Sequence, residues 1–154
     1  MPANAQPETR SETPDFVLET EIKCSPERLW SALTETSHMQ LYHFAMCSVK
    51  TTMKQGGRFD HYFPDGNLMF GGKIISIDPP NRMEMTFEPT FFGPDAPASR
   101  CTYEIEKTAV GCRFTVLHFA IPEGQDGVKE GWENIAARLK AYLEHGTTNQ
   151  EYVA

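Results

Sequence analysis

Two histidines and one cysteine are the side chains in this sequence best suited to acid–base or nucleophilic chemistry. His61 and His118 fall on the alternating stretches RFDHYF and CRFTVLHF, each on the face that carries apolar residues. If Lys107 pairs with Cys112 across a hairpin, Cys101 lies opposite His118. A Cys–His pair in a pocket can support nucleophilic or acid–base catalysis. His118, His61 and Cys101 are therefore the candidate catalytic residues.

The same residues also have an ordinary structural explanation. No third group that would orient the imidazole is evident in the sequence. His118 would then be a polar wall residue that binds a ligand, water or the backbone, and Cys101 would contribute packing. The histidines have no HxH or HExxH spacing and the four cysteines form no CxxC pair. The sequence thus predicts neither a metal site nor a cofactor.

An apolar wall is predicted around these polar candidates. Met83, Met85 and Phe87 share one face of the stretch RMEMTFE. Ordinary core packing explains this stripe equally well, although flexible Met side chains also suit a pocket for irregular apolar molecules. Tyr103, His61 and His118 would fix the orientation of a ligand. The predicted ligand-binding residues are Phe59, His61, Phe70, Met83, Met85, Phe87, Tyr103, Val116, His118, Trp132, Ile135 and Leu139.

A long amphipathic helix over 123–145 must cover this wall from one side. Its apolar residues recur at helical spacing and its charged residues fall between them. Everything upstream is typical of strands, apart from two short helices, one starting at Ser25-Pro26 and one over 37–42. The predicted strands cover 16–22, 45–50, 58–63, 68–77, 82–88, 100–107 and 112–119.

Hairpin-length connections between these strands demand antiparallel pairing. The sequence therefore predicts an α+β fold, in which a curved antiparallel sheet of six to seven strands wraps around the long C-terminal helix. A gap between helix and sheet is expected, because one helix cannot cover a coiled sheet completely. We expect the helix to seal one end of this gap with Val128, Trp132 and Ile135, and to cover the other with Leu139, Tyr142 and Leu143.

The remaining segments set the expected boundaries. Residues 1–14 are predicted to be a flexible arm, 15–146 a single domain and 147–154 a C-terminal tail. The stretch 89–98 (PTFFGPDAPA) is apolar but rich in proline and glycine, which predicts a mobile loop or flap.

The composition narrows the classes of partner. A net charge of −7 and a pI of about 5.2 argue against a nucleic-acid binder, which needs a basic face. No apolar run is long enough to span a membrane and no signal peptide is recognisable, so a cytoplasmic location is expected. The cysteines are expected to be reduced and buried. One strand face is expected to be acidic and solvated, or to dock a basic partner: Glu84, Thr86, Glu88, Thr102, Glu104 and Glu106.

Five short motifs follow one another in a fixed order. They are CSPERLW with ALT from Cys24, GGRF at 56–59, Asp65-Gly66 with 71–74, IDPPNRM at 77–83, and His118 with Gly131-Trp132 and Leu139. In these residues the chain resembles the START-like (SRPBCC) superfamily, and within it the activator of heat-shock protein 90 ATPase homologue branch. The resemblance covers roughly residues 16–145 and implies a helix-grip fold.

The resemblance implies several functions rather than one. The superfamily includes lipid and steroid carriers, polyketide aromatases and cyclases, plant-hormone receptors and co-chaperone domains, and the branch offers no agreed catalytic motif to carry over. We expect a small hydrophobic or amphipathic ligand between helix and sheet, gated by 89–98. One alternative is a cyclase, dehydratase or hydrolase with His118 or His61 as acid–base. Another is a co-chaperone-like partner of a heat-shock ATPase, less favoured because the extra N-terminal domain of full eukaryotic activators is not evident. A homodimer is a further possibility.

Overall fold

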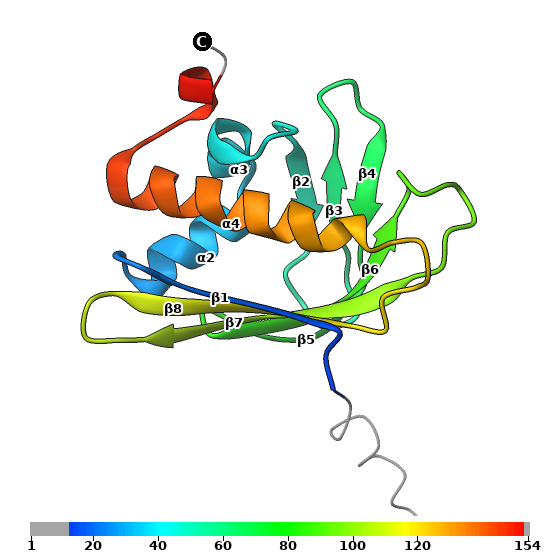
Figure 1. Cartoon of the computed structure of the whole chain (residues 1–154), viewed down its shortest axis with the longest axis horizontal. Helices are drawn as coiled ribbons and strands as arrows, with labels where there is room; N and C mark the ends of the chain where they lie inside the picture. Colours follow the sequence, from blue (N-terminus) through cyan, green and yellow to red (C-terminus); the bar gives the residue numbers. More distant parts are fainter. Residues whose placement is uncertain (1–12, 153–154) are drawn as a thin grey trace, which may run out of the picture.

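The computed structural model describes residues 13–152 and shows an α+β fold, as predicted (Figure 1). The arm predicted over 1–14 lies outside the described residues except for its last two positions. The elements run in the order β1 (Phe16–Ile22), α2 (Pro26–Thr34), α3 (Thr36–Tyr42), β2 (Ser48–Thr51), β3 (Phe59–Tyr62), β4 (Leu68–Gly71), β5 (Ile74–Asp78), β6 (Arg82–Pro89), β7 (Ser99–Lys107), β8 (Cys112–Phe119), α4 (Gly127–His145) and η2 (Asn149–Tyr152).

The strands form one antiparallel sheet of eight strands in the order β1-β8-β7-β6-β4-β3-β2, with β5 also paired to β6. The count exceeds the expected six to seven because the strand predicted over 68–77 is divided into β4 and β5. Both halves pair with β6, through Phe70 opposite Pro89 and Ile74 opposite Met85. A side chain at Gly72 would meet the Thr86 carbonyl oxygen at 2.3 Å, so this break requires glycine.

The register predicted for the last hairpin is confirmed. Lys107 lies opposite Cys112, and Cys101 lies opposite His118. The inward-facing positions of β7 and β8 therefore lie where the alternation placed them, and both His61 and His118 are buried.

The helices begin and end at residues with clear physical reasons. The Ser25 hydroxyl caps α2 by accepting a hydrogen bond from the Arg28 backbone N–H at 3.2 Å. The long helix α4 starts at Gly127, not at residue 123 as expected. Gly124 has φ +88°, a left-handed conformation that a right-handed helix cannot contain. At the other end Gly146, with φ 72°, forms the left-handed cap.

Figure 1 shows α4 lying across the concave side of the sheet, with α2 and α3 near its C-terminal half. The buried apolar core fills the space beneath it and includes Ile22, Leu29, Ile74, Met83 and Leu139, each fully or almost fully buried. Within the part of the chain that the structure describes, no helix is long and apolar enough to cross a membrane.

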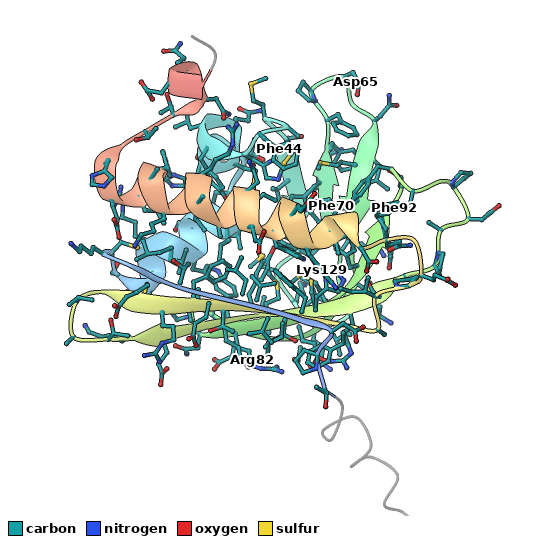
Figure 2. All side chains as sticks on the ribbon, viewed as in Figure 1. Phe44, Asp65, Phe70, Arg82, Phe92 and Lys129 are labelled. Atoms are coloured by element: carbon teal, nitrogen blue, oxygen red, sulfur yellow. The ribbon has the colours of Figure 1, made fainter. Side chains whose placement is uncertain are left out.

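The outer face of the sheet carries matched charges, which corrects the expectation of an acidic surface. Glu84 pairs with Arg100 at 2.7 Å, and Glu106 pairs with Arg113 at 2.6 Å. Arg82, labelled on this face in Figure 2, lies 3.7 Å from a carboxylate oxygen of Glu104. Because arginines neutralise these carboxylates, the face offers little attraction to a basic partner.

The segment after Gly146 folds back onto α3. The Asn149 side-chain amide donates hydrogen bonds to the backbone oxygens of Gln40 and His43, and its oxygen accepts one from Arg138. Part of the predicted tail is thus tied to the domain by specific contacts.

Candidate functional site

An apolar cavity of about 320 Å³ lies at the N-terminal end of α4. Figure 2 labels Phe44 and Phe70, which border this cavity from the loop after α3 and from β4. The cavity reaches the surface beside Phe44 and Phe91, each about half exposed. Its wall consists of Phe44, Phe63, Met69, Phe70, Phe87, Phe91, Gly127, Val128, Gly131, Trp132 and Ile135. Its volume is at the lower end of the range for small-molecule sites, and such sites are mostly apolar.

The cavity exists because α4 presents small residues at this end. Gly127 and Gly131 are one helical turn apart and both line the cavity. A methyl group added to either would meet no atom within 4 Å. Gly is costly inside a helix, so Gly131 occupies a position where a larger residue would favour the helix but narrow the cavity.

A second, much smaller void of about 20 Å³ adjoins this cavity. Phe70, Trp132 and Ile135 line both spaces and therefore form the partition between them. Four polar side chains reach the inner void, Tyr42, His43, His61 and Tyr103; its remaining lining residues are Leu33, Met39, Phe114, Val116 and Ala136.

His61 is the polar group of this inner void with an unmet hydrogen-bonding requirement. Its side chain is 2% exposed, and among the described residues its Nδ1 has no hydrogen-bond partner. Burial, with a smaller contribution from nearby His43, lowers the pKa of His61 to about 3. The ring is held between Phe59 and Phe70, with centroid distances of 4.8 and 4.1 Å. His61 is thus a fixed, neutral imidazole.

His118 differs from His61 because both of its ring nitrogens are engaged. The Trp132 indole N–H donates to His118 Nδ1 at 2.9 Å, so this nitrogen carries no proton. The proton of the neutral ring is then on Nε2, which donates to the Ser99 hydroxyl at 2.7 Å. Burial lowers the pKa of His118 to about 4. This arrangement joins β7, β8 and α4, and it favours a positioning role over proton transfer.

Cys101 lies opposite His118 in the sheet, yet its environment does not activate a thiol. The residue is almost fully buried, and burial raises its pKa to about 12. A nucleophilic cysteine requires the thiolate, which a nearby cation or helix N-terminus stabilises. The register predicted for the pair is therefore present without the electrostatics that nucleophilic chemistry needs.

The structure separates the predicted site residues into three groups. Phe70, Phe87, Trp132 and Ile135 line the larger cavity; His61, Tyr103 and Val116 line only the inner void. The other five are buried among core side chains and line neither space: Phe59, Met83, Met85, His118 and Leu139. A row of ring contacts through Phe70 and Phe87 lies between His61 and His118, so the two histidines do not form one site.

Several cavity residues were absent from the predicted site. Met69 alternates with Phe70 in β4 and was placed on no face, and Phe44 follows α3, where periodicity gives no direction. Alternation put Phe63 on the same face as Phe59 and His61, but Phe63 was not included in the predicted site. Val128 was expected to seal this end of the gap, yet together with Trp132 and Ile135 it lines an open space. The two glycines gave a usable indication, since small residues on the inner face of a helix leave room.

The 89–98 stretch borders the cavity through Phe91. Phe91 and Phe92 are 49% and 37% exposed, with ring centroids 4.8 Å apart. Its role as a gate stays a prediction. Among residues 13–152, no cluster of three or more His, Cys, Asp or Glu side chains is arranged to hold a metal ion.

Several solved structures share this fold. Protein MLL2253 from Mesorhizobium loti is 22% identical, with 83% of this chain and 95% of that chain covered and a TM-score of 0.69. CalU16 from Micromonospora echinospora is 18% identical, with coverage of 88% and 78% and a TM-score of 0.68. The Aha1 dimer from Colwellia psychrerythraea is 17% identical, with coverage of 85% and 96% and a TM-score of 0.68.

At these identities the likeness concerns the fold alone. A search of curated proteins found no match to the chain. Residues 23–144, by contrast, match the family described as "Activator of Hsp90 ATPase homolog 1-like protein". This match spans most of the chain, from the end of β1 almost to the end of α4. The chain therefore belongs to the family of Activator of Hsp90 ATPase homolog 1-like proteins.

Proposed function

We propose that the protein binds a small hydrophobic or amphipathic molecule in the cavity at the N-terminal end of α4. The observation that carries this proposal is the cavity itself, whose wall is made of aromatic, aliphatic and glycine residues. Burying apolar ligand surface in such a wall contributes about 25 cal/mol per Å² before the costs of association. A carrier or sensor role fits this chemistry.

An enzyme that uses the same space is supported less well. His118 has both nitrogens engaged, and burial raises the pKa of the Cys101 thiol to about 12. Of these three candidates, His61 is the one that lines a void and has a ring nitrogen without a hydrogen-bond partner among the described residues. We therefore assign His61 a binding contact in this proposal.

Filling the cavity tests the proposal directly. Gly131→Leu would extend a side chain into the open space beside Trp132 and Ile135. We expect native mass spectrometry of the purified wild type, followed by extraction, to detect a bound apolar molecule, and titration with octylbenzene to give saturable binding. Gly131→Leu is expected to weaken octylbenzene binding at least tenfold while the protein stays folded.

Ala137→Leu is the matched control, because Ala137 lies on the exposed side of the same helix. This variant adds a similar side chain outside the cavity and should leave binding unchanged. The proposal fails if wild type neither carries nor binds an apolar molecule, or if both variants bind octylbenzene as wild type does.

The proposal also covers assembly and location. One neighbour of the same fold is described as a dimer, which supports a homodimer here as well, and light scattering of the purified protein tests this. A cytoplasmic location and a co-chaperone-like association with a heat-shock ATPase stay predictions. Stimulation of such an ATPase by Gly131→Leu as strongly as by wild type would assign that activity to a surface other than the cavity.

A further inference from the structure

We infer that the ligand is uncharged and carries one hydroxyl group, which passes the Phe70–Trp132–Ile135 partition and hydrogen-bonds to Nδ1 of His61. This inference rests on the proposed function and specifies the class of molecule that the cavity takes. Its basis is the juxtaposition of two features, an apolar outer cavity and, on a residue that lines the void behind it, a buried nitrogen without a hydrogen-bond partner among the described residues.

The inner void matches the size of a hydroxyl group. Its volume of about 20 Å³ exceeds the roughly 10–15 Å³ that one water-sized group requires. A carboxylate or an amide is larger than one water-sized group. The three partition residues are shared by both spaces, so a molecule in the outer cavity lies one side-chain layer from this void.

His61 specifies the kind of hydrogen bond. A buried polar atom without a partner costs free energy, so a ligand group that pairs with it gains more than one that does not. In a neutral imidazole Nδ1 is a hydrogen-bond donor when it carries the proton, and an acceptor when the proton is on Nε2. A hydroxyl group can both donate and accept, and it therefore satisfies either tautomer. A carbonyl group satisfies one tautomer alone.

The lining of both spaces argues against a charged ligand. None of the residues that line the cavity or the void is Lys, Arg, Asp or Glu. Burial keeps His61 and His43 neutral, with their pKa values lowered to about 3 and about 4. A carboxylate would thus enter without a counter-charge, which is far more costly than burying a neutral hydroxyl group.

Three probes with the same apolar body test the inference: 4-octylphenol, octylbenzene and 4-octylbenzoate. Dissociation constants follow from titrations monitored by tryptophan fluorescence, since Trp132, one of the two tryptophans, lines both spaces. For wild type we expect 4-octylphenol to bind about tenfold more tightly than octylbenzene, the ratio for one well-formed buried hydrogen bond. We expect 4-octylbenzoate to bind most weakly.

His61→Leu removes the nitrogen and keeps an apolar side chain of similar volume. Its affinity for 4-octylphenol is expected to fall to that for octylbenzene, whose own affinity stays unchanged. A readout on wild type avoids reliance on this variant: the ¹⁵N chemical shift of His61 Nδ1 should change with 4-octylphenol and not with octylbenzene.

The outcomes separate this inference from the function on which it rests. Equal binding of 4-octylphenol and octylbenzene by wild type, or a preference that persists in His61→Leu, would overturn the hydroxyl assignment alone. Failure of all three probes to bind would overturn both.

Discussion

The two halves of α4 cover the same sheet in opposite ways. The C-terminal half packs tightly, with Leu139 fully buried and Leu143 4% exposed. The N-terminal half presents Gly127 and Gly131 and leaves a cavity of about 320 Å³. One helix thus seals one end of the domain and keeps the other hollow, and the size of the residues on its inner face makes the difference.

Polar contacts reinforce this contrast. At the packed end, Arg28 of α2 donates to the Leu143 backbone oxygen at 2.9 Å, and the Lys23 backbone N–H donates to Glu144 at 2.9 Å. At the hollow end, the polar contact of α4 with the sheet is the buried bond from Trp132 to His118. The contacts at the packed end therefore hold α4 in place, and a ligand can bind at the hollow end without breaking them.

Acid is expected to produce the largest effect, because it acts on three buried histidines. Burial lowers the pKa values of His43, His61 and His118 to about 4, 3 and 4. Between pH 6.5 and these values the unfolded chain binds protons that the folded chain does not, so stability falls as the pH falls. Each histidine contributes about 2 kcal/mol of this loss by pH 5, or about 6 kcal/mol together.

Urea unfolding at pH 7 and pH 5 measures this loss. A loss of about 6 kcal/mol approaches the total stability of an ordinary domain. His61→Leu supplies the control, since it should recover about 2 kcal/mol of the difference between the two pH values. Equal stability of wild type at both pH values would show that these three histidines are accessible to protons in the folded state.

Strand register and helix capping could be predicted from the sequence far better than the cavity. Alternation in 100–107 and 112–119, together with the assumed pairing of Lys107 with Cys112, placed Cys101 opposite His118, and the structure has this register. The start of α2 at Ser25-Pro26 could be predicted equally well, since helix capping depends on residues that are close in sequence. These features depend on neighbours in sequence or on a strict period.

The cavity depends on how separate elements pack against one another, which the spacing of residues along one strand or helix does not indicate. Met83 and Phe87 alternate on the same strand face, yet Met83 is buried in the core, whereas Phe87 lines the cavity together with Gly127 and Gly131 of α4. The role of His118 depends on Trp132, which belongs to another element. The indole N–H of Trp132 donates a hydrogen bond to Nδ1 of His118, so this nitrogen is already engaged. Spacing identified the chemistry-bearing residues but not which of them were already engaged.

Truncation of one apolar residue at each end measures the contrast itself. Leu139→Ala at the packed end is expected to lower the free energy of unfolding by about 2–5 kcal/mol, because it creates a new void. Val128→Ala at the hollow end removes methyl groups that already face open space, so we expect a loss of about 1 kcal/mol. Urea denaturation gives both values. Similar losses at the two ends would mean that the hollow end is packed in solution.

The smallest effect expected here has the opposite sign. Gly131→Ala replaces a helix-interior glycine whose added methyl group would meet no atom within 4 Å, so it should stabilise the protein by about 0.5–1 kcal/mol. Gly72→Ala is the contrasting variant, because its methyl group would lie 2.3 Å from the Thr86 carbonyl oxygen, and it should destabilise. Thermal unfolding followed by circular dichroism compares the two. A gain in stability together with weaker octylbenzene binding in Gly131→Ala would show that this glycine lowers the stability of α4 in order to keep the cavity open, whereas a loss of stability would place a neighbouring side chain in that space.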